Sequence, residues 1–194
     1  MKYLSLLLLP TVSAQYFSFG NYFSTGPVAT NSWIRQATTT LVLPALNSPH
    51  NGNLGLWPGM GTKFNSGADG HLVQGLAIST VGLHVHSAYS FTDKYNDATA
   101  NFDQTVSVNG VKVSTLSTKS GYGAGWGTAM ECQQANCGTV PEHHYVNTTL
   151  IMNTADPNYK NTIGLNGASG NLVTTDGGKT WTVADIKINL YTFT

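Results

Sequence analysis

Short runs of alternating residues, rich in Val, Ile, Thr and aromatic side chains, follow one another along the chain after its first residues. Gly, Asn, Asp and Pro separate these runs, and no long stretch repeats apolar residues with the helical period. Alternation places successive side chains on opposite faces of a strand. The pattern therefore predicts an all-β chain folded as a two-sheet antiparallel β-sandwich.

Turn signals fix part of the strand order. Asn109-Gly110 and the segment 176–179 (Asp-Gly-Gly-Lys) each separate two β-rich runs, and Asn-Gly and Asp-Gly are typical of tight hairpin turns. Both are predicted to be hairpins with paired strands on either side. The predicted strands cover residues 32–43, 54–60, 71–80, 83–91, 104–108, 111–116, 126–133, 145–152, 170–174 and 181–193.

The N-terminal residues predict secretion. Lys2 gives a positive start, an apolar run begins at Leu4, and Val12-Ser13-Ala14 offers small residues for cleavage. This order is typical of a secretory signal peptide, and the run is too short to span a bilayer. We expect residues 1–14 to be the signal peptide, residues 15–194 to form one β-sandwich domain, and the protein to be extracellular.

Charge narrows the range of partners. Only 9% of the residues are charged, and nine basic side chains balance nine acidic ones. No basic tract is present, so neither nucleic acid nor a membrane surface is an expected partner. We expect a monomer that acts on an extracellular polypeptide or polysaccharide.

The secretory context gives two covalent predictions. Cys132 and Cys137 are the two cysteines of the chain, and they are expected to form a disulfide in an oxidising compartment. Asn147-Thr148-Thr149 is an N-glycosylation acceptor, which predicts that Asn147 lies on the surface.

Two strands offer polar side chains for chemistry. Gln74 shares a strand face with Leu72 and Ile78, where its amide is either satisfied in a core or at an edge, or lines a cleft. Glu131 and Gln133 share a face with small residues, which leave room above the carboxylate. The alternative is a surface glutamate beside a disulfide turn.

Aromatic residues and histidines give further candidates. Trp57, Trp126 and Gln133 are candidate substrate-binding residues, with core packing as the alternative for the two tryptophans. The aromatic residues among 16–23 either cap the sandwich or form an exposed apolar patch. His84 and His86 face the same way on a strand, but no third ligand is placed beside them. We expect no metal and no cofactor.

Two parts of the chain resemble the fungal glutamic peptidases, the eqolisins. The segment 55–61 (Gly-Leu-Trp-Pro-Gly-Met-Gly) followed by 72–75 (Leu-Val-Gln-Gly) is similar to the strands that precede and carry that family's catalytic glutamine. Residues 129–131 (Ala-Met-Glu) fall where its catalytic glutamate lies. The resemblance implies a concanavalin A-like, jelly-roll type of sandwich secreted by a fungus, with Gln74 and Glu131 as the catalytic pair.

Two functions follow as hypotheses. In a glutamic-peptidase-like hydrolase, Glu131 would take a proton from water in acid and Gln74 would stabilise the oxyanion, provided that both side chains reach one water. The chain also resembles secreted fungal concanavalin A-like lectins, glucanases and polysaccharide lyases. That likeness implies a carbohydrate-binding or carbohydrate-cleaving sandwich, or a catalytically silent relative.

Overall fold

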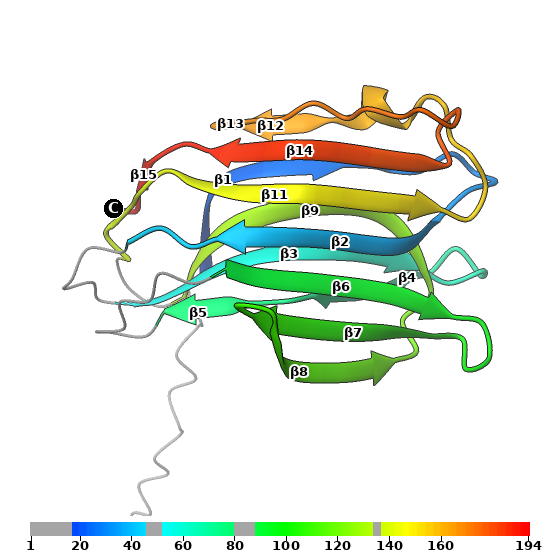
Figure 1. The fold of residues 1–194 in the computed structure, drawn as a ribbon, viewed down its shortest axis with the longest axis horizontal. Helices are drawn as coiled ribbons and strands as arrows, with labels where there is room; N and C mark the ends of the chain where they lie inside the picture. The colour runs from blue at the N-terminus through cyan, green and yellow to red at the C-terminus, as the bar shows by residue number, and fades with distance from the viewer. Residues whose placement is uncertain (1–16, 46–51, 80–87, 134–136) are drawn as a thin grey trace, which may run out of the picture.

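The strands form two packed layers, as the sequence predicts. The computed structural model describes residues 17–45, 52–79, 88–133 and 137–194. In Figure 1 the front layer runs from β13 through β14, β11, β2, β6 and β7 to β8, and the rear layer contains β12, β1, β9, β3, β4 and β5. All of these strand pairs are antiparallel.

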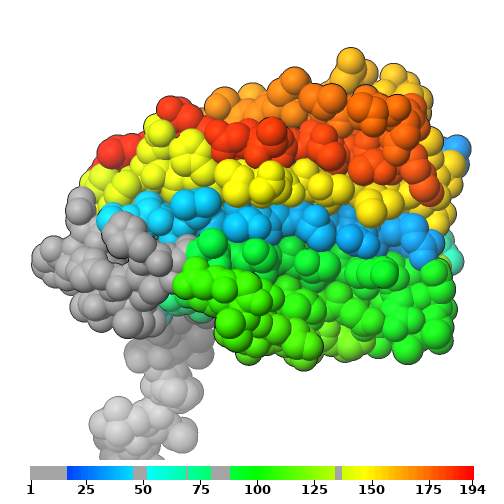
Figure 2. Space-filling model, in the orientation of Figure 1, coloured from blue at the N-terminus to red at the C-terminus, as the bar shows by residue number. Residues whose placement is uncertain are grey.

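The front layer presents its strands side by side in Figure 2, with β14 and β11 above β2 and β6. Its strands are β2 (Ile34–Val42), β6 (Ala88–Asn96), β7 (Asn101–Val108), β8 (Val111–Thr118), β11 (His143–Met152), β13 (Ala168–Ser169) and β14 (Thr180–Ile188).

The rear layer is built around β9, which lies between β1 and β3. Its strands are β1 (Phe17–Thr25), β3 (Asn53–Lys63), β4 (Asp69–Gln74), β5 (Ala77–Ser79), β9 (Tyr122–Gln133) and β12 (Gly164–Asn166). The remaining elements are the small pair β10 (Thr139–Val140) and β15 (Tyr191–Thr192), and the 3-10 helix η1 (Tyr159–Thr162). No helix in these described parts is long and apolar enough to cross a membrane.

Strand alternation decides which side chains enter the core. Along β9, the residues from Trp126 to Cys132 alternate strictly between buried and partly exposed, so that Trp126 and Met130 point into the sandwich while Glu131 points out. The two layers interlock large side chains that are fully buried, including Phe23, Leu56, Met60, Met130, Phe102, Tyr145 and Trp181.

The two layers meet at one corner, where Ile34 of β2 pairs with Gly123 of β9. A Cβ atom at Gly123 would lie 2.4 Å from the Met60 sulfur and 2.6 Å from the Ile34 carbonyl oxygen. Only a residue without a side chain allows β2 and β9 to approach this closely.

The predicted hairpin at Asn109-Gly110 is confirmed, and the one at residues 176–179 is confirmed only as a turn with a single bridge. Asn109 and Gly110 have φ values of 49° and 81° and join β7 to β8. Such positive values at both central positions are those of a type I′ turn. In the second hairpin, Val173 pairs with Thr182 across the segment 174–181, but as a single bridge rather than as a strand.

Other element boundaries differ from prediction. The predicted strand 71–80 is divided into β4 and β5, and the break includes Gly75, where a Cβ would collide with the Phe91 ring of the opposite layer. The predicted strand 83–91 begins in residues outside the described ranges, and the described part, β6, extends to Asn96. β1 was not predicted as a strand. The signal peptide, His84 and His86 also lie outside the described residues.

Candidate functional site

The outer face of the rear layer is floored with glycine. β3 contributes Gly55, Gly59 and Gly61, and β9 contributes Gly125 and Gly127; we call these five residues the glycine floor. Gly59 pairs with Gly127 and Gly61 with Gly125, so bare backbone lies side by side across the two strands. A Cβ at Gly61 would meet no atom within 4 Å, whereas one at Gly59 would lie 3.1 Å from the Trp57 ring and from Leu72. A Cβ at Gly125 or Gly127 would meet the backbone of β1 at 2.6 or 2.7 Å, so of the five glycines only Gly61 faces open space.

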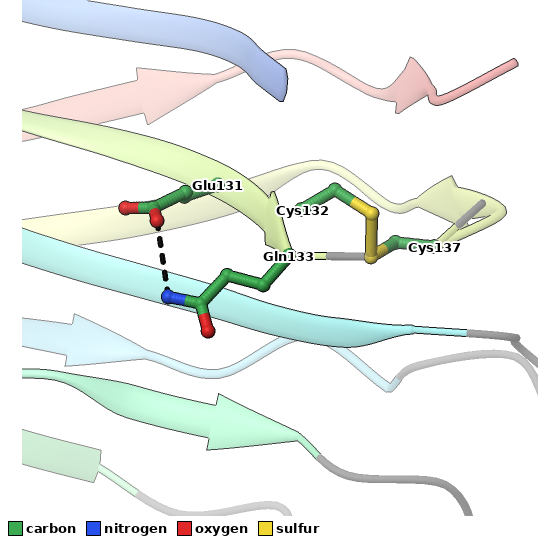
Figure 3. Close-up of a disulfide and its surroundings, with 4 residues drawn as sticks. All are labelled: Glu131, Cys132, Gln133 and Cys137. Carbon is green, nitrogen blue, oxygen red and sulfur yellow. Dashed lines mark hydrogen bonds between the residues drawn. A yellow bond between two sulfur atoms is a disulfide. The ribbon is translucent and has the colours of Figure 1, made fainter. Parts of the chain in front are cut away.

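Trp57, Glu131 and Gln133 form a hydrogen-bonded group at one end of this floor. The Trp57 Nε1–H donates to Glu131 Oε2 at 3.2 Å, and Gln133 Nε2–H donates to Glu131 Oε1 at 3.1 Å. Figure 3 shows the amide of Gln133 turned back toward the carboxylate. Trp57 pairs with Ala129, whose small side chain leaves space for the indole. Each carboxylate oxygen thus holds one N–H donor in place.

Exposed apolar side chains flank this group on both sides. Phe19 pairs with Glu131 and Phe17 with Gln133, and they are 58% and 46% exposed. On the other side, Leu72 and Ile78 are 51% and 52% exposed. Tyr22, Trp57 and Leu72 also line a hollow of about 300 Å³ above the floor. An apolar patch of this kind around hydrogen-bonding groups is typical of a binding surface.

Gln74 lies on the same outer face, as predicted, beside Leu72 at the edge of the layer. Its Oε1 is buried and has no hydrogen-bond partner among the described residues. The side chain lines a cavity of about 560 Å³ together with Gln104, Leu116 and Thr118. A buried acceptor without a partner is unusual in a folded protein. The amide therefore lines a cavity rather than being satisfied within the edge of the layer.

The strand register does not bring Gln74 to Glu131. Gln74 pairs with Gly59, and Glu131 pairs with Gly55, four residues further along β3. With strands about 4.8 Å apart and a rise of about 3.3 Å per residue, their Cα atoms are roughly 16 Å apart. Side chains stand nearly perpendicular to a sheet, so these two side chains do not approach each other closely enough to share one water molecule. The residue two strands away from Gln74 in the same row is Gly127, not an acid.

The prediction for Trp126 is wrong. Its indole is 3% exposed and packs edge-on against Phe23 with ring centroids 6.4 Å apart. Trp126 and Glu131 are five positions apart on one strand and therefore face opposite sides of the sheet. Trp126 is thus a core residue, whereas Trp57 and Gln133 do lie with Glu131 on the open face.

The disulfide prediction is confirmed, and the glycosylation prediction is not tested. Cys132 and Cys137 are joined by a disulfide, which confirms their pairing and ties the end of β9 beside Gln133 (Figure 3). Asn147 is exposed at a bulge in β11, where its φ is 54°, so its side chain is accessible to glycosylation, which stays a prediction. Within the described ranges no group of three His, Cys, Asp or Glu residues is arranged for a metal ion.

β1 places aromatic side chains beside the site, and no strand is predicted for these residues from the sequence. The sequence predicts that the aromatic residues among 16–23 cap the sandwich or form an exposed patch, but it does not predict their position next to Glu131. The available signal was the alternation of Phe17 and Phe19. A register shift between Phe19 and Tyr22 interrupts that alternation.

No protein-family profile and no curated protein matches this chain in sequence. Among solved structures, a scytalido-glutamic peptidase with a transition state analog inhibitor has 9% identity and a TM-score of 0.49, over 88% of this chain and 99% of that one. SCP-B, a member of the eqolisin family in complex with a tripeptide, has 10% identity and a TM-score of 0.41 over the same shares. A glycoside hydrolase family 16 endo-glucanase from Bacteroides ovatus has 10% identity and a TM-score of 0.29, over 60% of this chain and 71% of that one. Values this low assign neither a family nor an activity.

Proposed function

We propose that this protein binds an extended extracellular polysaccharide on the outer face of its rear layer. Trp57 would provide the stacking surface, and Glu131 and Gln133 would bind hydroxyl groups beside it. A sugar ring has apolar C–H faces and a rim of hydroxyls, so it fits an aromatic plane with polar groups at its edge. Gly61, where a Cβ would meet no atom within 4 Å, would leave room for a further part of the polymer.

The observation that carries this proposal is the hydrogen bond between the Trp57 indole and the Glu131 carboxylate. It holds an aromatic ring and a strong acceptor next to each other on an open face, before any ligand arrives. Preorganised groups lose little conformational entropy on binding, which favours affinity. Phe19, paired with Glu131 on β1, would extend the same surface.

Binding is favoured over cleavage by the number and spacing of catalytic groups. Residues 17–24, 53–61, 72–78 and 125–133, which form this face, contain Glu131 as their one acidic residue. Glycoside hydrolysis ordinarily uses two carboxylates, one on each side of the scissile bond. Peptide hydrolysis by a Gln–Glu pair requires both groups within hydrogen-bond reach of one water, and the register separates Gln74 from Glu131.

A pull-down with insoluble polysaccharides tests the proposal. Cellulose, chitin, β-1,3-glucan and xylan are incubated with the protein, and depletion from solution is measured. We expect retention on at least one of them, with affinity lowered about tenfold or more in Trp57→Ala and severalfold in Glu131→Gln, as for a central aromatic anchor and a charged hydrogen-bond acceptor. Glu142→Gln is the matched control, because Glu142 lies away from this face. Its carboxylate pairs with Lys187.

Two outcomes would contradict the proposal. One is no retention on any of the four polymers, or retention that Trp57→Ala and Glu131→Gln leave unchanged. The other is cleavage of a denatured protein substrate between about pH 3 and 5 that disappears in Glu131→Gln, which would restore the peptidase hypothesis.

A further inference from the structure

We propose that the cavity beside Gln74, between the edges of the two layers, binds the acetamido group of an N-acetylated sugar. The group that marks this site is the Gln74 side chain, whose buried oxygen has no partner among the described residues. The cavity is separate from the group formed by Trp57, Glu131 and Gln133. The inference therefore goes beyond the proposed function and does not depend on it.

The two walls of this cavity come from different layers. Among the described strands, β4 pairs only with β3 and β8 only with β7, so each is an edge strand of its layer (Figure 1). The cavity lies between these edges, and its lining residues from β4, β7 and β8 are His71, Leu72, Gln74, Gln104, Leu116 and Thr118. Leu72 and Leu116 are 51% and 57% exposed, so the cavity is open to solvent. Its volume of about 560 Å³ is within the usual range of ligand pockets, about 300–1,000 Å³.

Gln74 is held in place by the residue that follows it. A Cβ at Gly75 would lie 1.9 Å from the Phe91 ring of β6, so the backbone here touches the opposite layer. The Gly75 N–H also donates to the Pro58 carbonyl oxygen at 3.2 Å. These contacts fix the end of β4 against the front layer. The Gln74 amide is thus positioned before a ligand arrives, which lowers the entropy cost of binding.

Both walls have amide groups with unused hydrogen-bonding capacity. Gln74 Oε1 is buried, and leaving it without a donor costs free energy that a ligand N–H would recover. On the other wall, Gln104 Nε2–H donates to Thr118 Oγ1 at 3.4 Å. This distance exceeds the usual range of about 2.7–3.2 Å, so the bond is weak and the amide is available to a better acceptor. The rear wall therefore offers an acceptor and the front wall a donor.

An acetamido group matches this arrangement. The N–H and C=O of a trans amide point in opposite directions, so the N–H can donate to Gln74 while the C=O accepts from Gln104. Its methyl group would lie against the exposed apolar side chains of Leu72 and Leu116. Among the described residues that line the cavity, His71 is the only one with an aromatic ring. Recognition would therefore depend on the two amides rather than on stacking.

The test compares N-acetylated chitotriose with cellotriose, which share a β-1,4 backbone and differ in the acetamido group. Calorimetric titrations use the Trp57→Ala protein, so that sugar bound at the Trp57 end does not contribute. We expect chitotriose to bind about tenfold or more tightly than cellotriose, which lacks the amide N–H and the methyl group. Gln74→Leu in the same background should lower chitotriose affinity about tenfold. Its melting temperature should stay the same or rise, because the unpartnered acceptor is removed.

Gln36→Leu is the matched control, because Gln36 lies on β2, which β6 and β7 separate from β8. Gln104→Leu, on the opposite wall, should lower chitotriose affinity severalfold and keeps the test decisive if Gln74→Leu fails to fold. No binding of either trisaccharide, equal affinity for both, or chitotriose binding that both variants leave unchanged would overturn the proposal. Tighter binding of N-acetyl-trialanine would also overturn it, by assigning the cavity to a peptide. These results leave the role of Trp57 to the polysaccharide pull-down, so the two proposals can fail separately.

Discussion

Asp93 is a carboxyl group placed inside the sandwich. It lies on β6 between Phe91 and Tyr95, all three buried, and its side chain is 5% exposed. Burial raises its pKa from 3.8 to about 7, because the charged form loses its hydration. The folded protein therefore binds this proton more tightly than the unfolded chain does. Stability from this group is fully present below about pH 4 and is lost as pH rises to about 7.

Asp93→Asn is expected to stabilise the protein at neutral pH, because it removes a charge from the core while keeping the shape. The gain should approach about 4 kcal/mol at pH 7 to 8 and vanish near pH 4. Urea unfolding at intervals between pH 4 and 8 measures it. Asp103→Asn on β7 is a comparison of opposite sign, because hydrogen bonds from Ser117 and Asn96 lower the pKa of that exposed carboxyl. A gain that does not grow with pH would contradict the assignment.

His143 has the opposite pH dependence. It is 2% exposed, its Nδ1 lies 3.1 Å from the Pro141 carbonyl oxygen, and burial lowers its pKa from 6.5 to about 4. The unfolded chain then takes up the proton first, so stability from this group is present above about pH 6.5 and is lost as pH falls to about 4. Between these limits Asp93 and His143 offset each other in the wild-type protein.

His143→Asn should uncover the slope due to Asp93. We expect this variant to lose stability steadily between about pH 4 and 7, by up to about 4 kcal/mol, where the wild type changes little. In Asp93→Asn, stability should instead rise by about 3 kcal/mol between about pH 4 and 6.5. Parallel curves for the wild type and both variants would show that neither residue titrates as described.

For individual residues, the sequence predicts which face of a sheet a side chain lies on better than it predicts which side chains lie close together. Alternation correctly placed Glu131 and Gln133 with Ala129 on one face, because the side-chain period of a strand is fixed. The same alternation places Trp126 on the opposite side, inside the sandwich, which excludes the predicted binding role. The distance between Gln74 and Glu131 depends on the β3 residue with which each of them pairs. This register depends on the pairing between strands and cannot be read from either segment alone.

Among the elements, the β7–β8 hairpin depends on its turn residues. Gly110 has a φ of 81°, and a Cβ there would meet no atom within 4 Å. Gly110→Ala should therefore cost about 1 kcal/mol of stability through backbone strain alone. Gly61→Ala is a matched control, because Gly61 also faces open space but its φ lies outside the left-handed region. Equal stabilities of the two variants in urea unfolding would refute this account.

The break between β4 and β5 should tolerate no side chain. A Cβ at Gly75 would lie 1.9 Å from the Phe91 ring. Gly75→Ala must push the two layers apart, and we expect a loss of about 3 kcal/mol or more. Adding Phe91→Leu should recover part of that loss, since the smaller side chain makes room. Thermal unfolding of the single and double variants measures the coupling, and strictly additive losses would contradict direct contact.

The sequence predicts those strands that are joined by a turn whose own residues determine its conformation. Asn109-Gly110 specifies a hairpin by its own conformational preferences, so both flanking strands were predicted. β1 was missed because an irregularity at Gly20 and Asn21 interrupts its pattern and its partners are remote in sequence. β12 and β13 are three and two residues long, too short to show an alternation.

For the whole molecule, the layers and not the disulfide determine stability. Cys132 and Cys137 are separated by five positions, so their bond closes a short loop and constrains the unfolded chain only slightly. Replacing both with Ala should cost about 2 kcal/mol and leave the fold intact. Circular dichroism and urea unfolding check both points. Because Gln133 follows Cys132 directly, we also expect weaker polysaccharide binding; loss of the fold would show that the bridge has a larger role.

The two-layer architecture follows from the sequence because many short alternating strands need two facing sheets to bury their apolar sides. The order of strands within each layer does not follow, because it depends on pairings between distant segments. Secretion stays a prediction from residues that lie outside the described ranges.

The pairing of β1 has a consequence for the time course of folding. Phe17 pairs with Gln133, which is synthesised 116 residues later. At ribosomal rates of about 5–20 residues per second, the first strand waits on the order of ten seconds for its neighbour. During that interval Phe17, Phe19 and Phe23 have no sheet to join, and such long-range closure also slows refolding. A chaperone that shields this segment while the rest of the chain emerges would raise the yield of folded protein.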